Sequence, residues 1–578
     1  MANFYRDNSD IQFLFRHMDL APLAEVCEEG FRFAGQFEHA PADAAEAIRN
    51  YEMVLDSLGQ LCAEFIAPRA EGVDREGNVL NEDGTVTRAK GIAEAIEKLG
   101  QAEVMGFTLP HRFGGLNFPN LVYSMAIEIL SRADAALMNI FGLQGIAETI
   151  NAFASEEIKE KYLRDFSAGK VTGAMVLTEP DAGSDLQAVK LRAFQDAAGN
   201  WFLHGVKRFI TNGCGEVLLV LARSEPDEQG GLGLSLFLCE RQPAIRVRRI
   251  EDKLGIHGSP TCELEFHNAL GYLIGERRRG LVTYTMALMN GARVGIAAQS
   301  LGIAEAAYRE ARNYAHSRVQ FAKPIEDFPA VRDLLVEMKV LIEASRSLTY
   351  DASRVMDYDN ILTERIETGL IEKERIPEVK KEQRQYMRLA AFLTPVAKYY
   401  ASEAAIKVTN DAIQVLGGSG FMRDYPLERH LRDARITPIY EGTSQLQVVA
   451  AIRGVTSGVA ETYFTELDKD FPKNVEGLAK KLRAARLELK KAVEHAKAKG
   501  GDYTDLYARD LVDIAIDILL GYLFLKQAAA SKKKLLLARH FIPRAAARIR
   551  MLSRRVLSND VATIKHFEAL AGPPTAVA

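Results

Sequence analysis

Cysteine is scarce in this sequence. Five cysteines occur among 578 residues, and no two of them form a C-x-x-C pair. Disulfide-stapled folds and zinc sites need clustered thiols, so the scarcity argues against both and indicates a reducing compartment. No metal site is predicted. The five are Cys27, Cys62, Cys214, Cys239 and Cys262.

Long apolar runs are absent as well. The longest one, Ile514 to Leu525, is interrupted by Asp517 and is too short to cross a bilayer. The first residues, Met-Ala-Asn-Phe-Tyr-Arg-Asp-Asn, are polar and lack the apolar core of a signal peptide. We therefore expect a soluble, cytoplasmic protein with no transmembrane segment.

A strong net charge is also missing. The formal charge is −4, which predicts no nucleic-acid or membrane partner for the chain as a whole. The distribution is less even, because residues 526–555 hold ten Lys or Arg and no Asp or Glu. The plain interpretation is a helix whose cations pack against acidic neighbours or line a route for phosphates. The alternatives are a DNA-binding surface or attachment to a membrane surface.

What the sequence does have is enough apolar residues for several cores. Hydrophobic residues make up 48% and charged residues 26%, which is ordinary for a globular protein, and the length predicts several domains. Apolar spacing divides the chain. The predicted order is an N-terminal arm (1–45), a helical domain (46–170), a β-domain (171–282), a helical bundle (283–455) with an excursion at about 357–385, and a further helical domain (456–578).

The period of apolar residues changes from 3.6 to about 2 at Val171. Short apolar runs separated by Gly, Pro and Asn-Gly breaks then predict a compact antiparallel β-domain. The order of elements is not βαβ, and no G-x-G-x-x-G follows a predicted strand, which argues against a Rossmann site. The fold class is therefore α+β and mainly α. The predicted strands are 171–178, 191–194, 201–210, 217–222, 234–239, 245–250 and 262–266.

One carboxylate, Glu441, stands in the stretch Arg-Ile-Thr-Pro-Ile-Tyr-Glu-Gly-Thr-Ser-Gln, with no other charge between Arg435 and Arg453. Apolar surroundings disfavour the charged form of an acid and raise its pKa, which makes a carboxylate a useful base near neutral pH. The plainer interpretation is a helix N-terminus, with Glu441 stabilised by the dipole and Thr443 or Ser444 capping. This stretch alone does not decide between the two.

Four other segments carry candidate ligand-binding groups, each with a plainer interpretation. The loop 177–185 offers hydroxyls and backbone N–H groups, but such loops are common. Segment 207–213 ends in an Asn-Gly hairpin turn, or places Phe209 and Thr211 beside a planar ring. Arg318 either closes a helix or binds a pyrophosphate. Gly417–Gly420 is either a helix C-cap or a close approach to a phosphate.

The order and spacing of these segments resemble the acyl-CoA dehydrogenases, which are FAD enzymes. The resemblance covers about residues 46–455 and extends to KLGIHGSPTCELEF at 253–266, NGARVGIAAQ at 290–299 and IYEGTSQLQ at 439–447. It implies a helical domain, a middle β-domain and a C-terminal four-helix bundle. FAD would lie between the β-domain and the bundle, with a neighbouring subunit completing the site.

The resemblance also implies roles for individual residues. Glu441 matches the catalytic base, and Ala292 stands where relatives with their base elsewhere carry Glu. Phe209 stands where many relatives have Trp, which keeps an aromatic plane but loses the indole N–H. The implied FAD contacts are Leu177, Thr178, Phe209, Thr211 and Thr443 in the same subunit, and Arg318, Phe321, Gln414 and Gly418 toward the FAD of the partner. Ser184, Ser259, Asn290, Arg293 and Gly442 would line the acyl-CoA site.

The implied reaction is α,β-dehydrogenation of an acyl-CoA thioester to the 2-enoyl-CoA. In this family the base removes the α-proton while the β-hydride passes to flavin N5. Two hydrogen bonds to the thioester oxygen, from the backbone N–H of the base and a ribityl hydroxyl, stabilise the developing enolate. Electrons would then pass to electron-transferring flavoprotein, as in fatty acid β-oxidation.

The chain is longer than the common core of the family. Its extra segments resemble those of extended bacterial members such as the 3-(methylthio)propanoyl-CoA dehydrogenases, and we expect them to cover tetramer contacts and leave a homodimer. An acyl-CoA oxidase that uses oxygen is an alternative, and an FAD-containing DNA-binding relative is a further one. Acyl-chain length, branching and ring character cannot be derived from the sequence.

Overall fold

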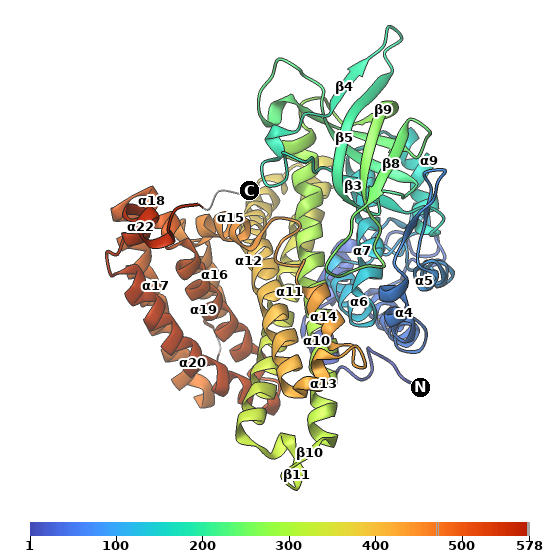
Figure 1. Ribbon diagram of the computed structural model, residues 1–578. Coiled ribbons are helices and arrows are strands. Elements are labelled where there is room, and N and C mark those ends of the chain that lie inside the picture. The colour runs from blue at the N-terminus through green and yellow to red at the C-terminus, as the bar shows by residue number, and fades with distance from the viewer. Residues whose placement is uncertain (470, 472, 575–578) are drawn as a thin grey trace. The chain divides into compact units, whose positions relative to one another are not determined.

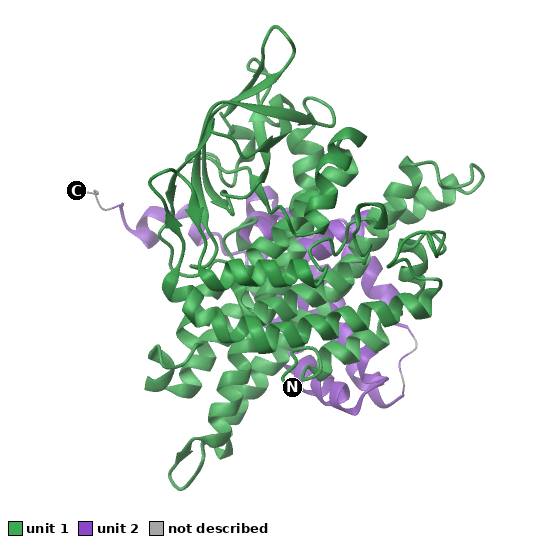
Figure 2. Ribbon diagram, turned by 90° about the vertical axis from the view of Figure 1, so that its right-hand side faces the viewer, with its two compact units in different colours: residues 1–386, 397–444 green, residues 387–396, 445–578 purple. Residues whose placement is uncertain are grey.

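The computed structural model describes residues 1–469, 471 and 473–574. Contacts divide the chain into two compact units, coloured separately in Figure 2. Unit 1 comprises residues 1–386 and 397–444, and unit 2 comprises residues 387–396 and 445–578. The chain passes between the units within one long helix and again just after Ser444. The predicted domain boundaries remain predictions.

The N-terminal part of unit 1 is helical, as predicted. The arm is not loose, because Tyr5, Ile11, Leu14 and Phe15 are buried in the same core as the helices that follow. The connector after α4 contains a small hairpin that the sequence did not indicate. The elements are α1 (Ser9–His17), α2 (Ala21–Cys27), α3 (Ala44–Leu61), α4 (Ala70–Glu76), β1 (Val79–Leu80), β2 (Val86–Thr87), α5 (Lys90–Gln101), α6 (Asn120–Ala133), α7 (Ala135–Gly142), α8 (Ile146–Phe153) and α9 (Glu156–Ser167).

A single sheet follows, and it forms the upper part of Figure 1. Its pairing order is β3-β6-β4-β5-β9-β7, with β8 added to β9, and β6 also pairs with β7. Most pairs are antiparallel as predicted, but β6 runs parallel to β3 and, at the pair Arg192 and Arg223, to β4. The strands are β3 (Gly173–Val176), β4 (Arg192–Gln195), β5 (Trp201–Thr211), β6 (Val217–Arg223), β7 (Leu234–Glu240), β8 (Ile245–Ile250) and β9 (Thr261–Ile274).

Long helices follow the sheet. Alanine and glycine on α10 allow close packing, since a Cβ at Gly302 would lie 2.4 Å from the Glu128 carbonyl oxygen of α6. Residues 357–385, predicted as an excursion, are the last turns of α11, a short connection and the first turns of α12. The elements are α10 (Met286–Ser317), β10 (Val319–Gln320), β11 (Lys323–Pro324), α11 (Pro329–Glu367), α12 (Ile376–Leu416), α13 (Gly418–Phe421), α14 (Leu427–Ala434) and α15 (Ser444–Thr456).

The rest of unit 2 is helical, in keeping with the sequence pattern. Helix α19 is buried along most of its length and packs against α16, α17 and α20. Its buried Asp517 is paired with Arg548 of α20. In the described part of the chain no helix is long and apolar enough to cross a membrane. The helices are α16 (Val459–Leu467), α17 (Glu476–Lys499), α18 (Gly501–Leu506), α19 (Ala508–Ala528), α20 (Lys532–Val556), α21 (Ala562–Lys565) and α22 (Phe567–Ala571).

Candidate active site

Glu441 lies in a tight loop between α14 and α15. Its backbone is left-handed, with φ of +54°, and Gly442 follows with φ of +89°. The left-handed region is unfavourable for a residue with a Cβ, so neighbouring contacts must hold Glu441 in place. Gly442 adopts the same region without this penalty, because it has no Cβ.

The positive charges of Arg293 and Lys398 act on the Glu441 carboxylate. Burial raises the pKa of Glu441, while the charges of Arg293 and Lys398 oppose that rise. Arg293 comes from α10, where its Nη1 donates to Asn290 Oδ1 at 3.1 Å, and Lys398 comes from α12. The structure therefore brings Arg293 and its partner Asn290 together with Glu441 and Gly442. The catalytic and substrate-binding roles given to these residues stay predictions.

A hydrogen-bond chain connects the Glu441 loop to the end of strand β5. Tyr440 donates to Gln299 of α10 and, at 3.3 Å, to Asn139 of α7. Asn139 donates to buried Ser259 at 3.4 Å, and the next carbonyl, that of Pro260, accepts from Asn212 N at 2.7 Å. Ser259 thus lies between the Glu441 loop and the β-domain.

Phe209 and Thr178 lie on neighbouring segments of the β-domain. Arg208 N donates to the Thr178 carbonyl at 2.9 Å, which joins the end of β5 to the loop after β3. The β5–β9 register shifts between Lys207 and Ile210, and Phe209 there has φ of +60° and is 53% exposed. An exposed ring at a bulge is a suitable surface for a planar ligand. Thr211 and Leu177 are close in sequence to these two residues, and Ser184 is exposed in the same loop.

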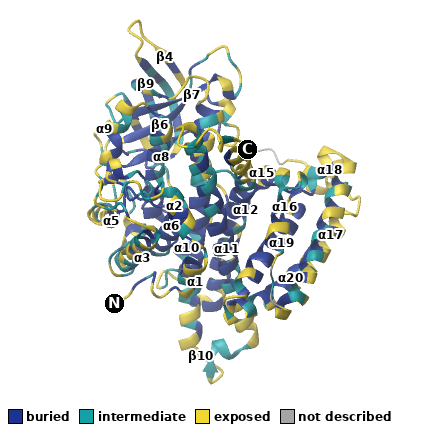
Figure 3. Ribbon diagram, turned by 180° about the vertical axis from the view of Figure 1, so that it is seen from behind, coloured by how far each residue is buried: buried dark blue, intermediate teal, exposed yellow. Residues whose placement is uncertain are grey.

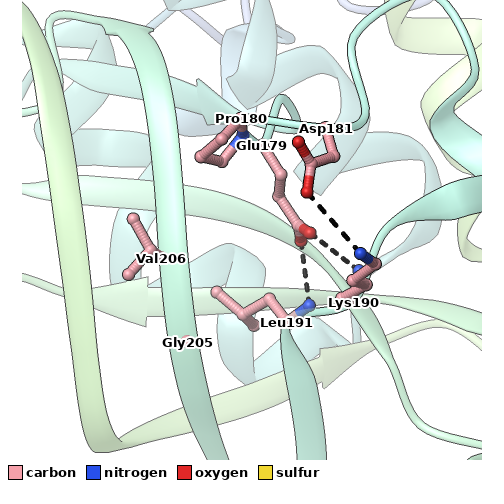
Figure 4. A pocket seen from close by; sticks show the side chains of 7 residues that line it. All are labelled: Glu179, Pro180, Asp181, Lys190, Leu191, Gly205 and Val206. Carbon is pink, nitrogen blue, oxygen red and sulfur yellow. Dashed lines mark hydrogen bonds and ion pairs between the residues drawn. The ribbon is translucent and has the colours of Figure 1, made fainter.

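A buried ion pair holds the loop that contains Leu177 and Thr178. Lys207 is fully buried, and its Nζ donates to the Leu177 carbonyl at 2.7 Å and lies 3.0 Å from Glu179 Oε1. The Glu179 carboxylate also accepts from the backbone N–H groups of Lys190 and Leu191, at 2.7 and 2.9 Å (Figure 4). Burial lowers the pKa of Lys207 to about 8, and Glu179 opposes this shift. Lys207 and Glu179 were not predicted as site residues.

Predicted Thr443 lies in the Glu441 loop, but four other predicted cofactor residues lie at or just beyond the C-terminal ends of α10 and α12. Arg318 directly precedes the β10–β11 hairpin, at the bottom of Figure 1, and Phe321 lies in the turn of that hairpin and is 89% exposed. Figure 3 shows the same end of the helices as exposed. Tyr314 donates to Ser419 at 3.3 Å, which places Gln414 and Gly418 beside this hairpin. Within one chain, these four residues do not meet Thr178 and Phe209.

The three parts of the chain match the family models of the acyl-CoA dehydrogenases. The N-terminal domain model matches residues 49–170, the middle domain model 174–269 and the C-terminal domain model 294–445. An acyl-CoA dehydrogenase of Bacillus subtilis is 38% identical over 61% of this chain and 87% of its own length. The 3-methylmercaptopropionyl-CoA dehydrogenase of Ruegeria pomeroyi is 32% identical over 76% of this chain and 74% of its own.

A solved structure extends the likeness in fold to nearly the whole chain. The acyl-CoA dehydrogenase of Bacillus anthracis, complexed with FAD, covers 91% of this chain and 92% of its own, with a TM-score of 0.74 and 24% identity. The chain belongs to the acyl-CoA dehydrogenase family. It is an FAD-dependent oxidoreductase that acts on the CH–CH group of acyl-CoA thioesters.

The residues present fit FAD. The exposed Phe209 ring and the hydroxyls of Thr178 and Thr211 offer contacts for a flavin ring. At Gly418 no atom lies within 4 Å of where a Cβ would stand, so a phosphate can approach this backbone. Arg293 Nε is buried and has no hydrogen-bond partner among the described residues, which leaves a donor for a bound ligand.

Replacement of Lys207 by Met should weaken FAD binding about 10-fold, because the Leu177–Thr178 backbone loses the ammonium group that fixes it. The dissociation constant of FAD, measured by fluorescence on reconstituted apoprotein, checks this. Lys170→Met is the matched control, since that side chain is 72% exposed and lies 3.7 Å from Asp165. Equal FAD affinity in the Lys207→Met variant and the control would contradict the role given to Lys207.

Proposed function

We propose that this protein converts an acyl-CoA to its 2-enoyl-CoA, with Glu441 as the base that removes the α-proton. The observation that carries the proposal is the position of Glu441, a carboxylate with a raised pKa in a strained loop beside Arg293 and Lys398. A raised pKa makes the ionised carboxylate a stronger base, which favours abstraction of the α-proton.

The other predicted residues take defined roles in this proposal. Leu177, Thr178, Phe209, Thr211 and Thr443 hold the isoalloxazine end of FAD in the same subunit. The bound flavin supplies the acceptor for the β-hydride. Gly442 leaves space for the thioester, while Ser184, Ser259, Asn290 and Arg293 line the acyl-CoA path. For the reaction to proceed, the Glu441 carboxylate has to lie beside the α-carbon, on the side of the substrate opposite the flavin ring.

A homodimer completes the cofactor site. The supporting observation is that Arg318, Phe321, Gln414 and Gly418 form an exposed group at the end of the helices away from Thr178 and Phe209. In a two-subunit site this group reaches the FAD of the partner, where the Arg318 guanidinium suits the diphosphate. The mass in solution tests the dimer, and a tetramer would overturn it.

The rate of α-proton removal should rise with pH through the pKa of Glu441, since only the carboxylate form accepts a proton. Burial raises that pKa above the ordinary value of 4.5, so the acid limb should lie above pH 4.5. The measurement is the rate of anaerobic flavin bleaching at saturating acyl-CoA as a function of pH. An acid limb at or below pH 4.5 would contradict a buried base.

Electron-transferring flavoprotein is the proposed electron acceptor, and oxygen is the alternative. The experiment is to reduce the enzyme anaerobically with acyl-CoA, and then to add either oxygen or electron-transferring flavoprotein. A dehydrogenase is reoxidised by the flavoprotein and only slowly by oxygen. Rapid oxygen consumption with release of hydrogen peroxide would identify an oxidase.

The contacts of the basic segment 526–555 weaken the DNA-binding alternative. Arg548 is paired with Asp517, and Arg555 lies 3.4 Å from Asp510, both on α19. Some of the cations of the segment therefore pack against acidic neighbours, as the plain interpretation of the sequence expects. The alternative is ruled out if the protein fails to shift duplex DNA in a gel even at low salt.

A further inference from the structure

The loop that carries Glu441 is held by two side chains of α12. Lys398 Nζ donates to the Gly442 carbonyl at 2.7 Å. Ser444 Oγ donates to Glu403 Oε1 at 2.6 Å. Since Lys398 and Glu403 belong to one rigid helix, the residues that follow Glu441 are fixed at two points.

Lys398 is unusual among these contacts because it is fully buried. Burial disfavours the ammonium form and lowers the pKa of Lys398 to about 7, while the charge of Glu441 opposes this shift. An apolar side chain such as Met would fill the same space without that desolvation cost. Packing alone therefore does not explain a lysine at this position.

The backbone beside Lys398 needs an external restraint. Glu441 has φ of +54° and carries a Cβ, so its left-handed conformation is unfavourable in isolation. The bond from Lys398 ends on the carbonyl of the next residue, Gly442. Loss of that bond removes one of the contacts that hold the peptide group next to Glu441, so the carboxylate is held less firmly in its working position.

We propose that Lys398 is a positioning residue for Glu441, which fixes the Glu441–Gly442 backbone and supplies positive charge that keeps the Glu441 carboxylate ionised. This inference rests on the proposed function, in which Glu441 is the base. Lys398 itself need not touch the acyl-CoA or the flavin.

Three charged groups set the electrostatics around Lys398. Glu441 and Glu403 favour its ammonium form, and Arg293 of α10 disfavours it. Arg293 and Lys398 both act to lower the pKa of Glu441. The effect of burial is larger, so the pKa of Glu441 is raised overall. Removal of the Lys398 charge takes away one of the two cations named above as lowering the pKa of Glu441, so that pKa rises.

The test compares Lys398→Met with the wild-type holoenzyme. We expect kcat to fall about 100-fold, because a small displacement of a base has an effect of that size, while KM for acyl-CoA changes little. The acid limb of the pH–rate profile moves to higher pH. Amide hydrogen exchange of the peptide that contains residues 439–444 becomes faster, which is a readout independent of turnover.

Two more variants keep the test decisive. Lys398→Gln retains a polar donor without the charge, so it also moves the acid limb to higher pH even if the Met variant does not fold. Lys407→Met on the same helix is the matched control, because Lys407 is 56% exposed and pairs with Asp411 at 2.8 Å. Its kcat, pH profile and hydrogen exchange should equal those of the wild type.

The outcomes separate this inference from the proposed function. The role of Lys398 alone is overturned if Glu441→Gln is inactive while folded Lys398→Met and Lys398→Gln keep the kcat, pH profile and hydrogen exchange of the wild type. Full turnover in Glu441→Gln would instead overturn the assignment of the base.

Discussion

Glu441→Gln abolishes turnover of acyl-CoA while the protein keeps its bound FAD. Glutamine has nearly the same shape as glutamate, but its amide cannot accept the α-proton. The expected loss in kcat is at least about 10³-fold, at the scale of removing a general base. Steady-state turnover with an artificial electron acceptor measures the loss, and the visible spectrum of the purified variant reports the flavin.

The spectrum is the control for this variant. Among the predicted site residues only Leu177, Thr178, Phe209, Thr211 and Thr443 are expected to hold FAD in the same subunit, so a change at Glu441 should leave the FAD content equal to that of the wild type. Full activity in Glu441→Gln would mean that another group removes the proton, and the assignment made from the sequence would be wrong.

Arg346→Met should destabilise the protein more than any surface substitution. Arg346 of α11 is fully buried, and its guanidinium contacts three buried carboxylates. Its Nη1 lies 2.5 Å from Asp10, and its Nη2 lies 2.7 Å from Glu128 and 2.9 Å from Glu305. These acids belong to α1, α6 and α10, so one cation joins four helices of unit 1, the N-terminal arm among them.

Removal of this cation leaves buried acids without their main partner, and the free energy of unfolding falls by about 3–5 kcal/mol. Urea unfolding followed by circular dichroism measures the change. Arg332→Met is the matched control on the same helix, because Arg332 is 62% exposed and its pair with Asp327 contributes at most about 1 kcal/mol. Equal unfolding midpoints for the two variants would contradict the structural role of the buried cluster.

The fold could be predicted wherever the pattern of the sequence is local. The change of period at Val171, and the Gly and Asn-Gly breaks that follow, marked the strands of the sheet closely. The parallel pairing of β3 with β6 was missed, because single-strand patterns contain no information on the direction of a partner. The end of β9 was also missed: it continues to Ile274, beyond the predicted Phe266.

The candidate site was predictable where a residue belongs to a contiguous motif. Glu441, Gly442 and Phe209 stand in such motifs, and in the structure Arg293 acts electrostatically on Glu441. Lys398, Lys207 and Arg346 were missed because their partners are distant in sequence, and Asp10 and Arg346 are 336 residues apart. The signal for Lys398 was present, since it is the only charged residue between Leu389 and Ser402.

The measurement that tests the central claim most directly is anaerobic single turnover with acyl-CoAs deuterated at the α-carbon. At saturating acyl-CoA the wild-type enzyme should bleach its flavin and release the 2-enoyl-CoA, more slowly with the α-deuterated substrate than with the unlabelled one. A panel of chain lengths, branched chains and ring-containing chains also identifies the preferred acyl group. Absence of bleaching with every acyl-CoA, or a bleaching rate indifferent to α-deuteration, would contradict removal of the α-proton by Glu441.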